Sequence, residues 1–114
     1  MRRLIGIALV ILTVCSAATV ASAHPAAKVK LRVLVGGGTV GVIRVGPQSG
    51  KKHTCLIDCT YLYARGTKIT VTATGARNVT HFVSWSGACH GTDHVCRLTL
   101  TTNSKTTAKF ALGG

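Results

Sequence analysis

Cysteines are the side chains with the most chemistry to offer in this sequence, and there are five of them. One stands near the N-terminus, and the other four form two close pairs: Cys15, then Cys55 with Cys59, then Cys89 with Cys96. Cys15 lies in an N-terminal segment that we expect to be removed, which leaves four cysteines, and in an oxidising compartment an even number favours disulfides over free thiols. Several pairings of the last four are possible, and the local one, Cys55 with Cys59 and Cys89 with Cys96, is the simplest.

A metal site is the main alternative for these cysteines. Three histidines lie close to them in the sequence: His53, His90 and His94. The spacing Cys55-x-x-x-Cys59 is compatible with zinc. Exported thiols tend to oxidise, however, and the second cysteine pair is too widely spaced for a usual zinc knuckle. We therefore expect disulfides, with no metal and no cofactor.

Catalysis requires groups that this sequence supplies sparingly. His90 follows Cys89 directly, but a Cys/His nucleophilic pair needs a free thiolate, which a disulfide would consume. Asp58 and Asp93 are the only carboxylate side chains, and salt bridges to the excess of Lys and Arg are a simpler role for them than acid and base catalysis. We expect that the chain is not an enzyme and has no catalytic residues.

Positive charge is the second notable feature. The chain has 14 Lys and Arg against two acids, a net charge of +12. Such an excess attracts anionic partners, and Lys51 and Lys52 in the loop expected over 46–52 are the candidate anion-binding residues. An anionic envelope polymer or glycan is the expected partner, although the charge could also serve solubility alone.

Nucleic acid is a less suitable partner because few aromatic side chains are free to stack on bases. Phe82, Trp85 and Phe110 are expected in the core, which leaves Tyr61 and Tyr63. The sequence therefore disfavours nucleic-acid binding.

The N-terminus has the features of a signal peptide over residues 1–23. Arg2 and Arg3 precede an apolar run over 4–14, and Ala21-Ser22-Ala23 supplies a small-x-small cleavage site. A retained membrane anchor over 4–23 and a lipid attached to Cys15 are the alternatives. We expect a protein that is secreted or held in the cell envelope, with a flexible lead-in over 24–30.

The remaining chain shows the periodicity of strands and none of helices. Alternation of apolar and polar residues predicts strands over these ranges: 29–35, 39–45, 68–74, 81–85, 95–101 and 106–112. The first two should form a hairpin through Gly36-Gly37-Gly38, whereas 53–64 has no clear period. This predicts a small, all-β, antiparallel domain of about six short strands with two local disulfides, for which a β-grasp-like arrangement is one possible form.

Several ordered motifs resemble the divergent InlB B-repeat, an internalin-B-type repeat of secreted and surface proteins of many bacteria. They are Gly38-Thr39-Val40, Cys55-x-x-x-Cys59, Tyr63-x-x-Gly66-Thr67-x-Ile69-Thr70-Val71-Thr72-Ala73, Phe82-x-x-Trp85-Ser86-Gly87-Ala88-Cys89-x-Gly91, Cys96-x-Leu98-Thr99-Leu100 and Thr107-Ala108-Lys109-Phe110. The resemblance covers one repeat-like domain over residues 31–112.

This resemblance implies a β module with local cystines, in which Trp85 packs near the second cystine and Phe110 closes the core. The chain departs from the pattern in Leu56, where glycine is frequent, in a long segment over 41–54 and in having a single copy. No activity is implied. We expect a secreted, non-catalytic binding module; a structural domain without ligand and a cationic toxin-like or antimicrobial protein are the alternatives.

Overall fold

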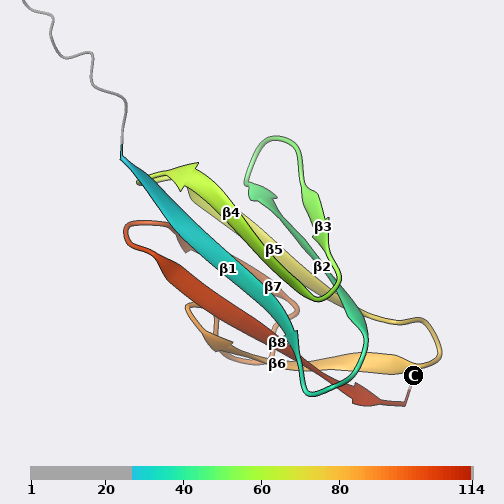
Figure 1. Ribbon diagram of the computed structural model, residues 1–114. Coiled ribbons are helices and arrows are strands. Elements are labelled where there is room, and N and C mark those ends of the chain that lie inside the picture. The colour runs from blue at the N-terminus through green and yellow to red at the C-terminus, as the bar shows by residue number, and fades with distance from the viewer. Residues whose placement is uncertain (1–26, 114) are drawn as a thin grey trace, which may run out of the picture.

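Eight strands account for most of the chain that the computed structural model describes, residues 27–113 (Figure 1). Their bounds are β1 (Lys28–Gly36), β2 (Gly41–Pro47), β3 (His53–Cys55), β4 (Asp58–Ala64), β5 (Lys68–Gly75), β6 (Thr80–Gly87), β7 (Val95–Thr99) and β8 (Ser104–Leu112). The signal peptide expected over 1–23, Cys15 and residues 24–26 of the expected lead-in lie outside the described residues. β1 begins at Lys28, within the segment expected as lead-in.

The strands form two four-stranded sheets that face each other. Sheet A has the order β4-β1-β8-β6, and sheet B has the order β3-β2-β5-β7. All pairings are antiparallel except that of β1 with β8, which is parallel. The all-β class is confirmed, but within residues 27–113 the chain has eight strands rather than six and no helix, so the fold is a mixed β-sandwich and not a β-grasp.

The strands missed in the sequence are β3 and β4. β3 has only three residues, which is too short to show a period. In β4 the inward positions are half-buried Cys59, Tyr61 and Tyr63 rather than aliphatic residues. Its alternation was therefore hidden in a segment of mixed polarity.

The expected hairpin between residues 29–35 and 39–45 is wrong. β1 pairs with β4 and β8, whereas β2 pairs with β3 and β5 in the other sheet. Gly37 and Gly38, with φ of 81° and 67°, carry the chain from one sheet to the other. Alternation showed that each strand buries one face, but the two strands contribute to opposite sides of the core instead of lying side by side.

The core fills the space between the sheets. Its largest fully buried apolar side chains come from both sheets and from the residue that follows β7: Leu31, Val33, Ile43, Val45, Ile69, Val71 and Leu100. Trp85 and Phe110 are also buried, at 4% and 2% exposure. Phe82 is partly buried and packs against both, with its ring centroid 5.2 Å from that of Trp85 and 6.0 Å from that of Phe110.

Candidate functional site

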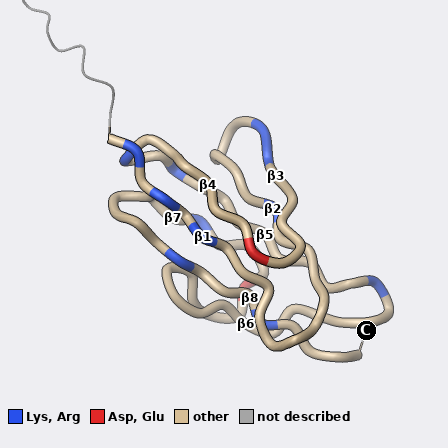
Figure 2. The backbone as a smooth tube through the Cα atoms, in the orientation of Figure 1, with Lys and Arg blue, Asp and Glu red and all other residues tan. Residues whose placement is uncertain are grey.

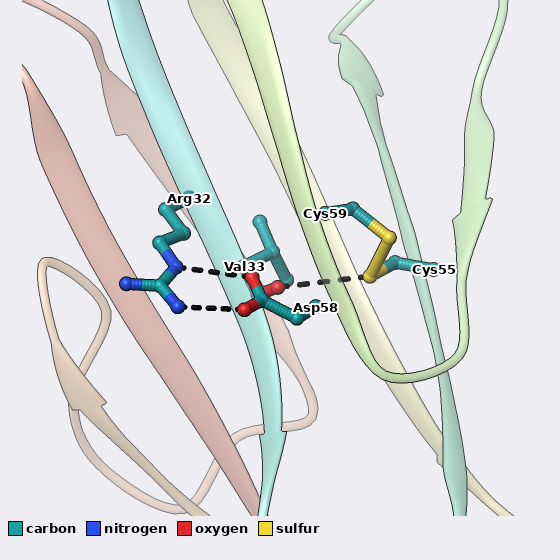
Figure 3. The surroundings of a disulfide bond; sticks show 5 residues. All are labelled: Arg32, Val33, Cys55, Asp58 and Cys59. Carbon is teal, nitrogen blue, oxygen red and sulfur yellow. Dashed lines mark hydrogen bonds and ion pairs between the residues drawn. A yellow bond between two sulfur atoms is a disulfide. The ribbon is translucent and has the colours of Figure 1, made fainter.

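Both disulfides join sheet A to sheet B. Cys55 ends β3 in sheet B and is bonded to Cys59 of β4 in sheet A (Figure 3). Cys89 follows β6 of sheet A and is bonded to Cys96 of β7 in sheet B. Since β3 and β4 are edge strands on one side and β6 and β7 on the other, the two local disulfides close both sides of the sandwich.

Each disulfide lies against core groups. Cys55 is fully buried, and its Sγ lies 3.6 Å from the carbonyl oxygen of Val33, a packing contact because a disulfide sulfur has no hydrogen to donate. In the second loop, Trp85 Nε1 donates to the carbonyl oxygen of Asp93 at 2.8 Å, and Trp85 N donates to that of Gly91 at 2.8 Å. Trp85 therefore holds the loop that the second disulfide closes.

The histidines and aspartates near the cysteines do not gather into a metal site or a catalytic site. The His53 ring stacks on Tyr61 with centroids 5.3 Å apart, and His94 Nδ1 lies 3.8 Å from Asp93 Oδ1. Within residues 27–113, no three His, Cys, Asp or Glu side chains are grouped closely enough to hold a metal. Because Cys89 is in a disulfide, His90 has no thiol beside it.

Five cations lie on the outer surface of sheet A, which we call the basic face. Lys28, Lys30 and Arg32 alternate with buried residues along β1, and Lys105 and Lys109 do so along β8. Figure 2 shows the basic positions following one another along β1. The parallel pairing places Arg32 in register with Lys105 and Gly36 in register with Lys109, so the two rows of cations meet at Arg32 and Lys105 and continue one another along sheet A. Successive cations on β1 are about 7 Å apart, the distance between every second residue, whereas Lys105 and Lys109 on β8 are four residues and about 13 Å apart.

The one carboxylate on this face is neutralised by a bidentate ion pair. Arg32 Nε donates to Asp58 Oδ1 at 3.0 Å, and Arg32 Nη2 donates to Asp58 Oδ2 at 2.6 Å (Figure 3). These hydrogen bonds lower the pKa of Asp58 and raise that of Arg32. Among the described residues, the other four cations of the basic face form no ion pair with a carboxylate.

An open depression of about 690 Å³ crosses the basic face where β1, β4 and the start of β8 meet. It is lined by Lys30, Arg32, Asp58, Thr60, Asn103, Ser104 and Lys105. Lys30 N donates to Asn103 Oδ1 at 2.9 Å, which ties the loop before β8 to β1. The depression thus combines positive charge with hydroxyl and amide groups, the donors that an anion needs.

The structure places the predicted cations Lys51 and Lys52 away from the basic face, in the loop between β2 and β3. Lys52 Nζ donates to the carbonyl oxygens of Pro47 and Gly50, at 2.7 and 3.4 Å, while Lys51 is exposed. The row on β1 had a visible signal in its alternation. The row on β8 had none, because its position depends on the pairing of two strands that are distant in sequence.

The family comparison agrees with these features. The model of the divergent InlB B-repeat domain matches residues 33–114, and no curated protein or solved structure matches the chain. Domains of this type are typical of bacterial surface and extracellular proteins and are generally non-catalytic. In the described part of the chain, no helix has the length and hydrophobicity to cross a bilayer. The match covers most of the sequence, and the chain therefore belongs to the divergent InlB B-repeat domain family.

Proposed function

We propose that this domain is a secreted, non-catalytic module that holds an anionic polymer of the cell envelope or matrix on its basic face. The observation that carries the proposal is the gathering of five cations on the outer surface of sheet A, where the single carboxylate is already paired with Arg32. Omitting Arg2 and Arg3 leaves 14 − 2 = 12 Lys and Arg against two acids, so the described domain carries a charge of 12 − 2 = +10.

The shape of this surface favours a polymer over a small molecule. Small-molecule sites are enclosed and mostly apolar. The basic face is instead an extended sheet surface with an open, polar depression where its two rows of cations meet. A line of cations along a surface binds a chain of anionic groups, because many weak contacts act together and release the counterions of the chain.

The proposal is tested by retention on a polyphosphate resin eluted with a salt gradient. The variant Lys30→Glu/Lys105→Glu reverses one cation in each row, and Lys51→Glu/Lys52→Glu makes the same change of charge in the loop between β2 and β3. We expect the first variant to elute at much lower salt than the wild type and the second to be affected far less. Circular dichroism of each variant verifies its fold.

Three other outcomes would contradict this assignment. Absence of salt-sensitive retention in the wild-type protein would indicate a structural domain without an anionic ligand. Equal losses of retention in both variants would show that retention depends on the net charge of the protein and not on the basic face. A larger loss in Lys51→Glu/Lys52→Glu would place binding in the loop that the sequence suggested.

A further inference from the structure

Exposed apolar side chains are concentrated at one end of the sandwich. Among the described residues, the exposed large apolar side chains are Val40 (55%), Leu56 (59%), Ile57 (75%), Leu62 (58%), Val79 (49%) and Leu112 (76%). All except Leu62 belong to the connections β1–β2, β3–β4 and β5–β6 or to the last residue of β8. We call these five residues the apolar end.

Backbone hydrogen bonds hold these segments together. Val35 N, near the end of β1, donates to the carbonyl oxygen of Ile57 at 2.8 Å. Thr80 Oγ1 donates to the carbonyl oxygen of Val40 at 2.6 Å, and Gly113 N donates to the carbonyl oxygen of Val79 at 2.9 Å. In Figure 1 these connections lie at the end opposite to the start of β1. The connections at that other end, over 48–52, 65–67 and 100–103, contain no exposed large apolar side chain.

The first disulfide fixes the most prominent part of the apolar end. Only three residues separate Cys55 from Cys59, so Leu56 and Ile57 stand at the tip of a closed loop and cannot turn into the core. Beside them runs an apolar groove of about 320 Å³, lined by Val40, Gly41, Val42, Leu56, Ile57 and Ala76. Exposed apolar patches of this kind mark surfaces for partners or membranes.

The charged residues around the apolar end indicate which kind of partner it can bind. Arg77 lies in the β5–β6 connection, two residues before Val79, and Lys109 is in register with Gly36 at the end of β1, next to the β1–β2 connection; both are exposed. Asp58, which follows Ile57, carries the carboxylate nearest in sequence to the apolar end, and that carboxylate is paired with Arg32. The apolar end is thus bordered by positive charge, which matches a bilayer with anionic headgroups. A second copy of the domain is a poor fit because each copy carries +10.

We propose that the apolar end docks onto an anionic lipid bilayer, with Leu56 and Ile57 entering the boundary between headgroups and acyl chains. This inference goes beyond the proposed function, since the apolar end shares only the bordering Lys109 with the basic face and leaves the other four cations of that face available to a polymer. The domain would then connect a membrane surface to an anionic polymer of the envelope.

The test is co-sedimentation of the protein with vesicles of phosphatidylcholine, with and without phosphatidylglycerol. We expect binding to the anionic vesicles and weak binding to the neutral ones. The variant Leu56→Ser/Ile57→Ser should lower the partition coefficient at least about tenfold, since two apolar side chains lose their burial in lipid. Leu62→Ser, which removes an equally exposed side chain away from the apolar end, should change it less than about twofold.

A second measurement reports insertion directly. Ile57→Trp should show a blue-shifted emission with anionic vesicles and quenching by lipids labelled in the acyl chain, whereas Leu62→Trp should show neither. The native Trp85 is buried and provides a constant background.

The inference is overturned if the wild-type protein does not bind anionic vesicles, or if Leu56→Ser/Ile57→Ser binds them as well as the wild type does. It is also overturned if sedimentation velocity shows a dimer that this variant abolishes, because the apolar end would then be a contact between copies. Retention on polyphosphate should be the same for this variant and the wild type, so failure here leaves the proposed function standing.

Discussion

Replacing Cys89 and Cys96 with alanine opens the side of the sandwich at which β6 and β7 diverge into different sheets. The disulfide closes a loop of eight residues, since the cysteines are seven positions apart. In the chain-entropy model such a loop contributes about 2.5 kcal/mol to the free energy of unfolding. For a domain of this size, a loss of about 2.5 kcal/mol corresponds to a decrease in Tm of roughly 10–20 °C.

The assay is thermal unfolding of the oxidised wild-type protein and of Cys89→Ala/Cys96→Ala, followed by near-ultraviolet circular dichroism. Alanine is chosen because Cys89 is buried and a serine hydroxyl there would add a desolvation cost. A Tm within about 2 °C of the wild type would refute the reasoning, because the connection between the sheets would then be equally restricted without the disulfide.

The first disulfide makes a similar contribution on the opposite side. Cys55 and Cys59 close a loop of five residues, worth about 2 kcal/mol in the same model. Because the two disulfides close different sides of the sandwich, their effects should add to about 4.5 kcal/mol. Against a domain stability whose lower limit is about 5 kcal/mol, this loss is large, so the fully reduced protein should unfold at a much lower urea concentration than the oxidised protein. An unchanged urea midpoint after complete reduction would contradict this.

Three smaller perturbations test other parts of the structure. Gly41→Ala should lower the free energy of unfolding in urea by about 1–3 kcal/mol, because a Cβ there would overlap the ring of buried Phe110. An unchanged urea midpoint would show that the ring moves freely. Tyr63→Phe should leave stability unchanged or raise it by up to about 1 kcal/mol, since the buried Tyr63 hydroxyl has no hydrogen-bond partner among the described residues, and a clear loss would reveal one. The hydrogen bonds from Arg32 lower the pKa of Asp58, so the ion pair stabilises the folded protein above pH 3.8, and this contribution is lost as the pH falls through the pKa of Asp58. Asp58→Asn should remove this pH-dependent contribution. Identical urea midpoints of the wild type and the variant from pH 2 to 7 would contradict this.

The sequence was informative about individual strands and uninformative about their neighbours. Alternation located β1 and β5 closely, because each has one continuous buried row and one exposed row. The same pattern could not show that β1 and β2 lie in different sheets, since burial of one face is compatible with a lateral neighbour or with a strand across the core. The parallel pairing of β1 with β8 joins segments more than 70 residues apart, for which no local pattern exists.

In the candidate site, too, the features that depend on local sequence were predicted and those that depend on the tertiary fold were not. Local spacing was enough to predict both disulfides, because each pair lies in one short connection. The candidate anion-binding residues were instead sought in a loop with two adjacent lysines, Lys51 and Lys52. The basic face requires two rows on distant strands, of which Lys30 and Lys105 are members. Charge at one position could be seen in the sequence, but its accumulation on a surface is a property of the tertiary fold.

The central claim is that the basic face of sheet A holds an anionic polymer, and the dependence of polyphosphate affinity on salt tests it most directly. Four cations of this face have no carboxylate partner among the described residues: Lys28, Lys30, Lys105 and Lys109. At roughly 0.7 counterions released per contact, log affinity should fall against log salt with a slope of about −3. In Lys30→Glu/Lys105→Glu the slope should fall to half of this or less, and an equal slope in that variant and the wild type would contradict the claim.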